Sequence, residues 1–130
     1  LCYADGASGH EAIAPLRKRI ARVDAILLAA PVYNYDLNAA AKNLVELTGG
    51  AWEGKVVGFL CAAGGRGSYM SPIGLANSLM FDFRCHIVPR FVYATGADFE
   101  GEAPGERIQE RLEGLVEAAV RLARALALAG

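Results

Sequence analysis

Two short segments hold the residue types best suited to binding a ligand. The first reads Pro-Val-Tyr-Asn-Tyr-Asp over positions 31–36 and joins a rigid proline to aromatic and amide groups. It offers hydrophobic contact and backbone N–H groups to a flat, amphipathic ring. The second reads Ala-Gly-Gly-Arg-Gly-Ser-Tyr over positions 63–69, and its glycines let the backbone approach a ligand closely or adopt positive φ. These residue types indicate binding of a flat ring.

Neither segment combines an acid, a base and a nucleophile. Ser68 and Ser71 have no histidine nearby, because His10 and His86 are distant in the sequence, and a hydrolytic triad is therefore disfavoured. Cys85 stands next to His86, but no second pair of ligands has suitable spacing for a metal. We therefore expect no catalytic side chain and no metal at these segments.

The two segments are more informative together than apart. A Gly-Gly pair alone usually marks a turn, and the residues after it do not complete a Gly-x-x-x-x-Gly-Lys phosphate loop. However, each segment follows an apolar run, over Ala25–Ala30 and Lys55–Ala62, that fits a strand buried on both faces. In a right-handed crossover two such strands can lie side by side, and ligands bind at their carboxyl ends. We therefore expect the two segments to flank one crevice.

Helices and strands alternate along the rest of the chain. Helical spacing of apolar residues and capping residues predict the other elements. The first is a helix over Ile13–Val23 with Pro15 in its first turn, and the second is a helix over Ala39–Thr48, capped by Asn38 and ended by Gly49 and Gly50. A third helix runs from the Ser71 N-cap and Pro72 to about Phe83, and it is followed by a strand over His86–Ala94, with Pro89 at an edge or bulge, and a loop over Gly96–Ala103. Pro104 opens a final helix, whose apolar stripe from Ile108 to Leu126, Val116 included, packs on the sheet. This order predicts an α/β fold, a doubly wound parallel sheet with helices on both faces, in a single domain over residues 1–130.

The expected sheet has fewer strands than such folds usually contain. Three strands are predicted, whereas doubly wound sheets commonly have about five. Residues 1–4 are interpreted as the tail of another strand, and a chain that begins with Leu1 rather than Met suggests that something upstream is missing. We therefore expect the sheet to be N-terminally incomplete.

The two segments and their flanking elements carry a resemblance to a known family. The run from Val23-Asp24-Ala25 through Pro31-Val32-Tyr33-Asn34, followed by Lys42-Asn43, resembles the strand, flavin loop and helix of the NADPH-dependent FMN reductase family, where the usual loop is Pro-Glu-Tyr-Asn. The run Ala63-Gly64-Gly65-Arg66-Gly67 resembles the second flavin loop of that family. The resemblance extends from about Ala12 to the end of the chain.

This resemblance implies a flavodoxin-like fold with FMN held at the edge of the sheet. The backbone of the first segment would lie along the flavin ring, and the second segment would close over another part of it. Hydride from NADPH or NADH would pass through the flavin to a quinone, a free flavin or a similar small-molecule acceptor, so that no catalytic side chain is needed. The residues expected to bind the cofactor are Pro31, Val32, Tyr33, Asn34, Tyr35, Ala63, Gly64, Gly65, Arg66 and Gly67.

The sequence departs from the family pattern at three places. Val32 stands where glutamate is frequent, which removes a charge but leaves the backbone role intact. Tyr35-Asp36 replaces a common glycine and small polar residue, so the pocket for the ring is expected to be narrower. The N-terminal strand and phosphate loop of the family, with its serines and arginine, have no counterpart in this sequence. Two alternatives therefore stay open, a flavodoxin-like electron carrier and a non-catalytic interaction domain that has lost the cofactor.

The whole chain excludes some other functions. Its net charge is −1 with mixed signs, unlike the basic face of a nucleic-acid binder. No apolar run approaches the length of a membrane span, and an odd count of three cysteines without a signal peptide favours a reducing, cytoplasmic setting. The helix ending at Phe83 carries more apolar residues than one core can accept. With the resemblance, this predicts a homodimer or homotetramer.

Overall fold

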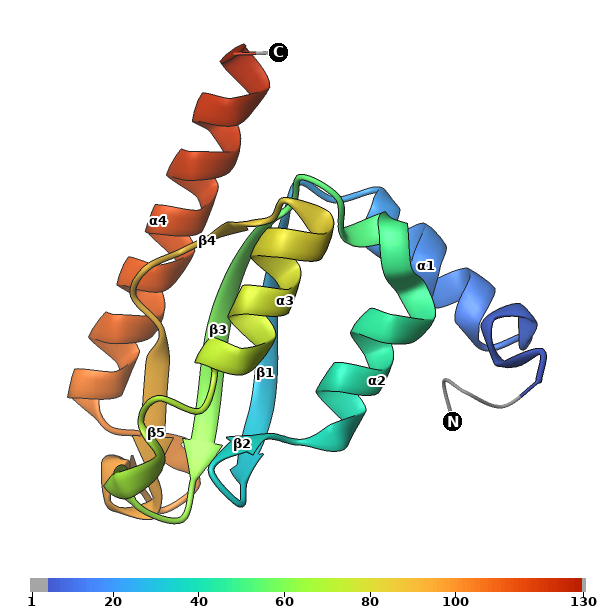
Figure 1. Cartoon of the computed structure of the whole chain (residues 1–130). Helices are drawn as coiled ribbons and strands as arrows, with labels where there is room; N and C mark the ends of the chain where they lie inside the picture. The colour runs from blue at the N-terminus through green and yellow to red at the C-terminus, as the bar shows by residue number, and fades with distance from the viewer. Residues whose placement is uncertain (1–4, 130) are drawn as a thin grey trace.

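A parallel sheet forms the centre of the fold in the computed structural model, which describes residues 5–129 (Figure 1). Strand β1 (Ala25–Tyr33) pairs in parallel with β3 (Val56–Ala63), from Ala25 beside Val56 to Pro31 beside Ala62. Strands β4 (His86–Ile87) and β5 (Val92–Thr95) both pair in parallel with the other side of β3. The predicted parallel α/β fold is confirmed. The expected strand tail at positions 1–4 lies outside the described residues.

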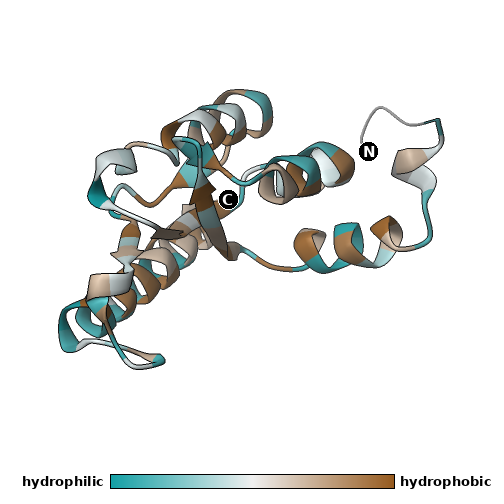
Figure 2. Ribbon diagram, turned by 90° about the horizontal axis from the view of Figure 1, so that it is seen from below, coloured by the Kyte–Doolittle hydropathy of each residue, from teal (hydrophilic) through white to brown (hydrophobic). Residues whose placement is uncertain are grey.

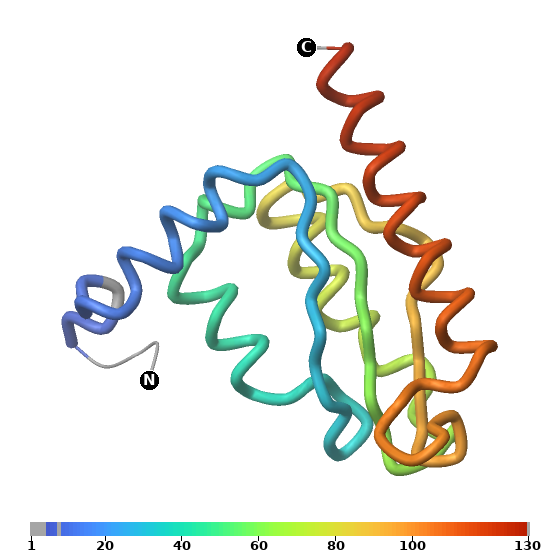
Figure 3. Tube along the Cα trace, turned by 180° about the vertical axis from the view of Figure 1, so that it is seen from behind, coloured from blue at the N-terminus to red at the C-terminus, as the bar shows by residue number. Residues whose placement is uncertain are grey.

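Helices cover both faces of this sheet. Helices α2 (Ala39–Thr48) and α3 (Ile73–Phe83) lie on one face, and α1 (Ile13–Ala21) packs beside α2 (Figure 1). The long helix α4 (Glu106–Ala129) runs along the opposite face and contacts β3 and β5, as the view from behind shows (Figure 3). Among the described residues no helix is long and apolar enough to cross a membrane.

The core is built on β3, because this strand has neighbours on both sides and helices on both faces. Its residues Val57 and Phe59 are buried on the α2 and α3 side, and Val56 is buried against α4. The strands at the centre are mostly brown, the hydrophobic end of the colour scale, when seen from below (Figure 2). Burial of apolar surface on both faces is what an uninterrupted apolar run predicts.

Strand β1 is covered less evenly. Leu28 and Ala30 face the buried side, whereas Leu27 on the α4 side is 41% exposed. The outer edge of β1 pairs, among residues 5–129, only at Val32 and Tyr33, where the two-residue strand β2 (Asp36–Leu37) runs antiparallel to it. Most of this edge therefore keeps free hydrogen-bonding positions.

Local capping signals account for α2. The Asn38 side chain accepts a hydrogen bond from the Ala41 backbone N–H at 3.3 Å, as an N-cap does. At the other end Gly49 has φ +48°, a conformation that a residue with a Cβ rarely adopts. Both predicted ends of this helix are confirmed.

The following expectations about the other elements need correction. The final helix begins at Glu106 and is not opened by Pro104, which is the last residue of a short strand. The predicted third strand is split into β4 and β5, because Pro89 between them has no N–H to donate to the sheet. The segment predicted as a loop over Gly96–Ala103 contains a small hairpin of β6 (Phe99–Glu100) and β7 (Ala103–Pro104). The Ser71 hydroxyl donates to the Ser68 carbonyl and does not cap α3. Val116, which was expected to pack on the sheet with the rest of the α4 stripe, is 44% exposed.

Candidate functional site

The structure brings the two candidate segments together at the carboxyl edge of the sheet. Pro31, where the first segment begins, lies beside Ala62, the residue before the second. A Cβ placed on Gly67 would lie 3.8 Å from the Tyr35 hydroxyl oxygen, so the far ends of the segments also meet. The two segments therefore lie side by side at the ends of β1 and β3, whereas the crevice between them stays a prediction.

The first segment is a hairpin rather than the expected open loop. Strand β1 continues through Pro31 to Tyr33 and returns as β2, with Tyr33 paired to Asp36. The two residues at the tip, Asn34 and Tyr35, have φ of +51° and +64°, the left-handed pair found in tight type I′ hairpin turns. An asparagine accepts this conformation more readily than a tyrosine does.

This hairpin divides its side chains between the core and the edge. Val32 is buried, so its side chain packs inside the protein and only its backbone faces the edge of the sheet. Tyr33 and Tyr35 are 63% and 75% exposed, and Pro31 is half-buried. The segment thus presents backbone, a proline ring and two phenol rings to a ligand.

The second segment presents almost bare backbone. A Cβ placed on Gly64 or Gly65 would meet no atom within 4 Å, so the space above both residues is open. Gly65 has φ −165° and ψ 176°, an extended conformation open to any residue, and neither Gly64 nor Gly67 has positive φ. The suggestion that these glycines supply positive φ is wrong. Close approach of backbone to a ligand is the role that the geometry leaves for them.

Aromatic residues outside both segments hold the second one in place. The Tyr93 hydroxyl on β5 donates a 2.6 Å hydrogen bond to the Gly65 carbonyl. The ring of Tyr69 lies 5.4 Å from that of Tyr93 and 4.8 Å from that of Phe91. Sequence reasoning missed Tyr93, because a single buried tyrosine in a strand carries no local signal of its partner.

Asp98 is the second support that sequence reasoning missed. Its side chain, only 4% exposed, accepts bonds from the Thr95 backbone N–H at 2.8 Å and from the Thr95 hydroxyl at 3.0 Å. Its other oxygen accepts from Arg66 at 2.9 Å and also from Arg107. The spacing Thr-x-x-Asp is a capping-box pattern and was the one readable sign of this cluster.

The same cluster fixes the charge state of Asp98. The Thr95 backbone N–H, more than any other group, holds the pKa of Asp98 well below its usual range. The Thr95 hydroxyl, Arg107 and Arg66 act in the same direction, whereas burial of the carboxyl opposes them. Asp98 is therefore ionised at neutral pH and can hold two guanidinium groups.

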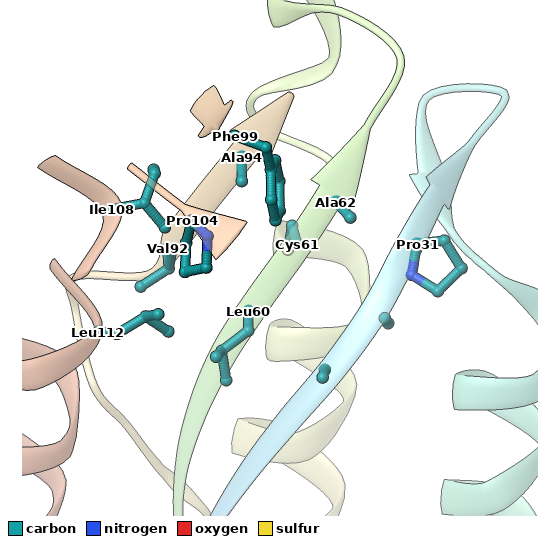
Figure 4. A pocket seen from close by; sticks show the side chains of 12 residues that line it. Pro31, Leu60, Cys61, Ala62, Val92, Ala94, Phe99, Pro104, Ile108 and Leu112 are labelled. Atoms are coloured by element: carbon teal, nitrogen blue, oxygen red, sulfur yellow. The ribbon is translucent and has the colours of Figure 1, made fainter. Parts of the chain in front are cut away.

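An apolar pocket of about 380 Å³ lies next to the two segments, between the sheet, the β6–β7 hairpin and α4 (Figure 4). Of the ten candidate residues only Pro31 lines it. Among residues 5–129 no charged side chain lines the pocket. Its lining residues are Ala29, Ala30, Pro31, Leu60, Cys61, Ala62, Val92, Ala94, Phe99, Pro104, Ile108 and Leu112. The pocket suits apolar groups and not a phosphate.

The candidate residues fit the ring of a flavin better than its phosphate. The ring needs a flat surface and room near the backbone, which the exposed tyrosines and the open space over Gly64 and Gly65 provide. A phosphate needs unengaged N–H donors or cations. Arg66 is the one cation among the ten candidates, and it is bound to Asp98. These residues could therefore hold the ring, while the phosphate needs groups beyond them.

Comparison with known proteins identifies a family that matches the sequence. Residues 1–100 match the model of the family described as NADPH-dependent FMN reductase. The structure is similar to the flavoenzyme NAD(P)H:(acceptor) oxidoreductase FerB from Paracoccus denitrificans, with a TM-score of 0.76 and 22% identity over 96% of this chain and 75% of that one.

Two further solved structures share the fold. An oxidoreductase from Corynebacterium diphtheriae has a TM-score of 0.70 and 21% identity over 88% of this chain, which spans 62% of that protein's length. The NADH:FMN oxidoreductase EMOB in its apo form has a TM-score of 0.67 and 15% identity over 93% of this chain, which spans 65% of that one. The similarity to these three oxidoreductases confirms the flavodoxin-like fold that is expected from the sequence.

Proposed function

The chain belongs to the NADPH-dependent FMN reductase family, and we propose that it holds the FMN ring between segments 31–35 and 63–67 as part of an NAD(P)H oxidoreductase. One observation carries this proposal. The two segments meet at one edge of the sheet, and the space over Gly64 and Gly65 is open.

The residues of the chain act by binding and orienting the ring. The backbone of Pro31–Asn34 would lie along one side of the ring, and the side chains of Tyr33 and Tyr35, which are exposed, would limit where the flavin can move. When bound, FMN would supply the redox chemistry, which is hydride transfer from NADPH or NADH and reduction of a quinone, a free flavin or a similar acceptor. The proposal requires no acid or base for this step and gives no such role to Tyr33 or Tyr35, the two candidate residues of a type that can serve as one.

A visible spectrum tests the proposal. The purified protein is mixed with FMN, separated from free flavin and treated with NADPH or NADH without oxygen, and a quinone is then added. We expect a yellow protein that bleaches with the nicotinamide and recovers with the quinone. A protein that takes up no FMN would leave only the interaction-domain alternative. A yellow protein that neither nucleotide bleaches would indicate an electron carrier.

We also propose that two copies pair through α3 and the turn that precedes it. Apolar side chains gather there in solvent: Met70 is 64%, Ile73 42%, Met80 37% and Phe81 80% exposed. A group of exposed apolar side chains on one helix and the turn before it commonly marks an interface. The Lys42 ammonium on α2 also donates to the Ser78 hydroxyl on α3 at 3.4 Å. This arrangement suits an isologous dimer, or a tetramer of such dimers.

Light scattering of the purified protein tests the pairing. We expect a dimer or tetramer at micromolar concentration, and dissociation when Phe81→Lys places a charge in the patch. The matched control is Leu128→Lys, which adds the same charge at a residue 90% exposed near the end of α4. A stable monomer of the parent protein would refute the pairing.

A reducing, cytoplasmic location completes the proposal. Cys61 and Cys85 are both free and buried, as expected of a protein that does not depend on disulfides. Fractionation of the cells that produce the protein, followed by immunodetection, tests this, and recovery outside the cytoplasm would refute it.

A further inference from the structure

Arg66 occupies the centre of the glycine-rich segment but does not point freely into the site. Its guanidinium donates to the Asp98 carboxylate at 2.9 Å, although 63% of the Arg66 side chain is exposed. Asp98 lies 32 residues further along the chain, in the turn after β5. The contact therefore ties the segment after β3 to the segment after its neighbouring strand.

The Asp98 carboxylate is itself held rigidly. One oxygen is bonded by the backbone N–H and the hydroxyl of Thr95, so the carboxylate cannot rotate without losing both bonds. The other oxygen accepts from Arg66 and from Arg107 in the first turn of α4. An exposed arginine normally samples many rotamers, whereas a charge-assisted bond to a fixed, nearly buried carboxylate selects one.

The glycine-rich segment needs such external support. Gly64 and Gly65 have no side chains, and a Cβ placed on either would meet no atom within 4 Å, so no side-chain packing of their own holds them in place. The Tyr93 hydroxyl bond fixes the Gly65 carbonyl from the β5 side. Asp98 fixes the next residue, Arg66, from the side of the turn, and the segment is held at two successive residues.

We propose that Asp98 is a positioning residue, which acts through Arg66 to fix the backbone of residues 64–67 in the conformation that receives the flavin ring. The proposal deepens the proposed function and rests on it. Asp98 does not touch the ring in this arrangement. It lowers the number of backbone conformations that binding would otherwise have to select.

A double-mutant cycle on FMN affinity tests this route. Asp98→Asn keeps the shape of the side chain and an acceptor for Thr95, but it loses the charge that binds Arg66. We expect Asp98→Asn and Arg66→Ala each to raise the Kd for FMN by about tenfold, measured by fluorescence quenching. Because both act through one contact, the double variant should be little worse than either single variant. Additive losses would overturn the proposal.

Hydrogen exchange of the ligand-free protein separates this proposal from the proposed function. We expect the amides of residues 65–68 to exchange roughly tenfold faster in Asp98→Asn and in Arg66→Ala than in the parent. Circular dichroism confirms that each variant is folded, and Arg66→Ala, at an exposed residue, keeps the test decisive if Asp98→Asn unfolds. Unchanged exchange in both variants would overturn the proposal even if the parent binds FMN.

Two controls identify the contact responsible. Arg107→Ala removes the other guanidinium from the same oxygen, and Glu102→Gln removes a charge from an exposed residue of the nearby hairpin. Both should leave exchange at residues 65–68 as in the parent. An Arg107→Ala effect as large as that of Asp98→Asn would show that Asp98 acts through α4 and not through Arg66. A parent that takes up no FMN would refute the proposed function, and exchange would then decide the role of Asp98.

Discussion

Gly65 lies where the bound ring and the backbone should be closest. The residue is extended and a Cβ on it would meet nothing within 4 Å, so the protein itself can accept a larger side chain there. We expect Gly65→Val to melt within a few degrees of the parent but to weaken FMN binding at least tenfold, because the side chain fills the space that the ring requires. Fluorescence titration measures the binding and circular dichroism the stability.

The matched control for that variant is Gly114→Val. Gly114 also has no atom within 4 Å of a Cβ position, but it lies on the exposed side of α4. The Gly114→Val variant should bind FMN as tightly as the parent. If folded Gly65→Val also binds FMN as tightly as the parent, segment 63–67 is not at the flavin site.

Tyr35 carries local backbone strain. At φ +64° its Cβ crowds the backbone, a cost of roughly 1–2 kcal/mol that glycine does not incur. We expect Tyr35→Gly to raise the free energy of unfolding by about 1 kcal/mol, since part of the gain is lost to the greater freedom of glycine in the unfolded chain. Urea denaturation measures the change. The control variant Tyr33→Gly, at a strand position, should destabilise the protein. A loss of stability in both variants would show that Tyr35 is not strained.

The buried thiols Cys61 and Cys85 should be unreactive. Burial raises the pKa of each to about 11 from an ordinary value of 9.0. At pH 8 roughly a hundredfold less thiolate is therefore present than in an exposed cysteine. In a Cys2→Ser variant we expect iodoacetamide to label the native protein slowly and the urea-unfolded protein quickly, as mass spectrometry can follow.

The same two thiols set a pH limit on stability. A raised pKa means that the folded state binds the proton more tightly than the unfolded state does. The contribution of the two protonated thiols to the free energy of unfolding is therefore complete below pH 9, and it is lost as the pH rises toward 11. Rapid labelling of the native protein by iodoacetamide at pH 8 would show that these thiols are accessible. The expected loss of stability above pH 9 would then have no basis.

Among the elements, α4 packs tightly against β3 at Gly58. A Cβ there would lie 2.9 Å from Leu115 Cδ1 and 2.9 Å from Leu27 Cδ2. Leu27 is exposed enough to turn away, but Leu115 is 2% exposed and cannot. We expect Gly58→Ala to cost about 1–3 kcal/mol through overpacking, measured by urea denaturation.

A second substitution checks this explanation. In a Leu115→Ala background the added methyl enters the space that the leucine vacates, so Gly58→Ala should cost little or become favourable. Equal costs in both backgrounds would mean that the loss arises from the strand backbone and not from contact with α4.

Elements with local signals were predictable from the sequence, and those with distant causes were not. Helix α2 has its cap and its terminating glycine in the adjacent residues, and both of its ends were found. The β1–β2 hairpin was missed because its tip is Asn34-Tyr35, whereas the recognisable type I′ signal has glycine in the second position. The positive φ at Tyr35 is imposed by pairing of the strands on either side, against the preference of the residue itself.

The site was predictable to the same extent. Topology alone placed segments 31–36 and 63–69 at one edge, because parallel strands end on the same side of a sheet. The positions of Gly65 and Arg66 within that edge depend on Tyr93 and Asp98, which lie 28 and 32 residues away. Contacts of that separation follow from the packed tertiary structure, and no periodicity in the sequence encodes them.

For the molecule as a whole, the uneven cover of β1 has a consequence for handling the protein. From Ala25 to Ala30 its outer edge has no neighbouring strand among residues 5–129, carries no charge and includes the exposed Leu27. Such an edge is a template for intermolecular β-pairing and aggregation. During storage of the 130-residue chain, thioflavin T fluorescence should therefore rise, and it should rise faster at higher protein concentration. Leu27→Lys should suppress this rise, because it places a charge beside the edge.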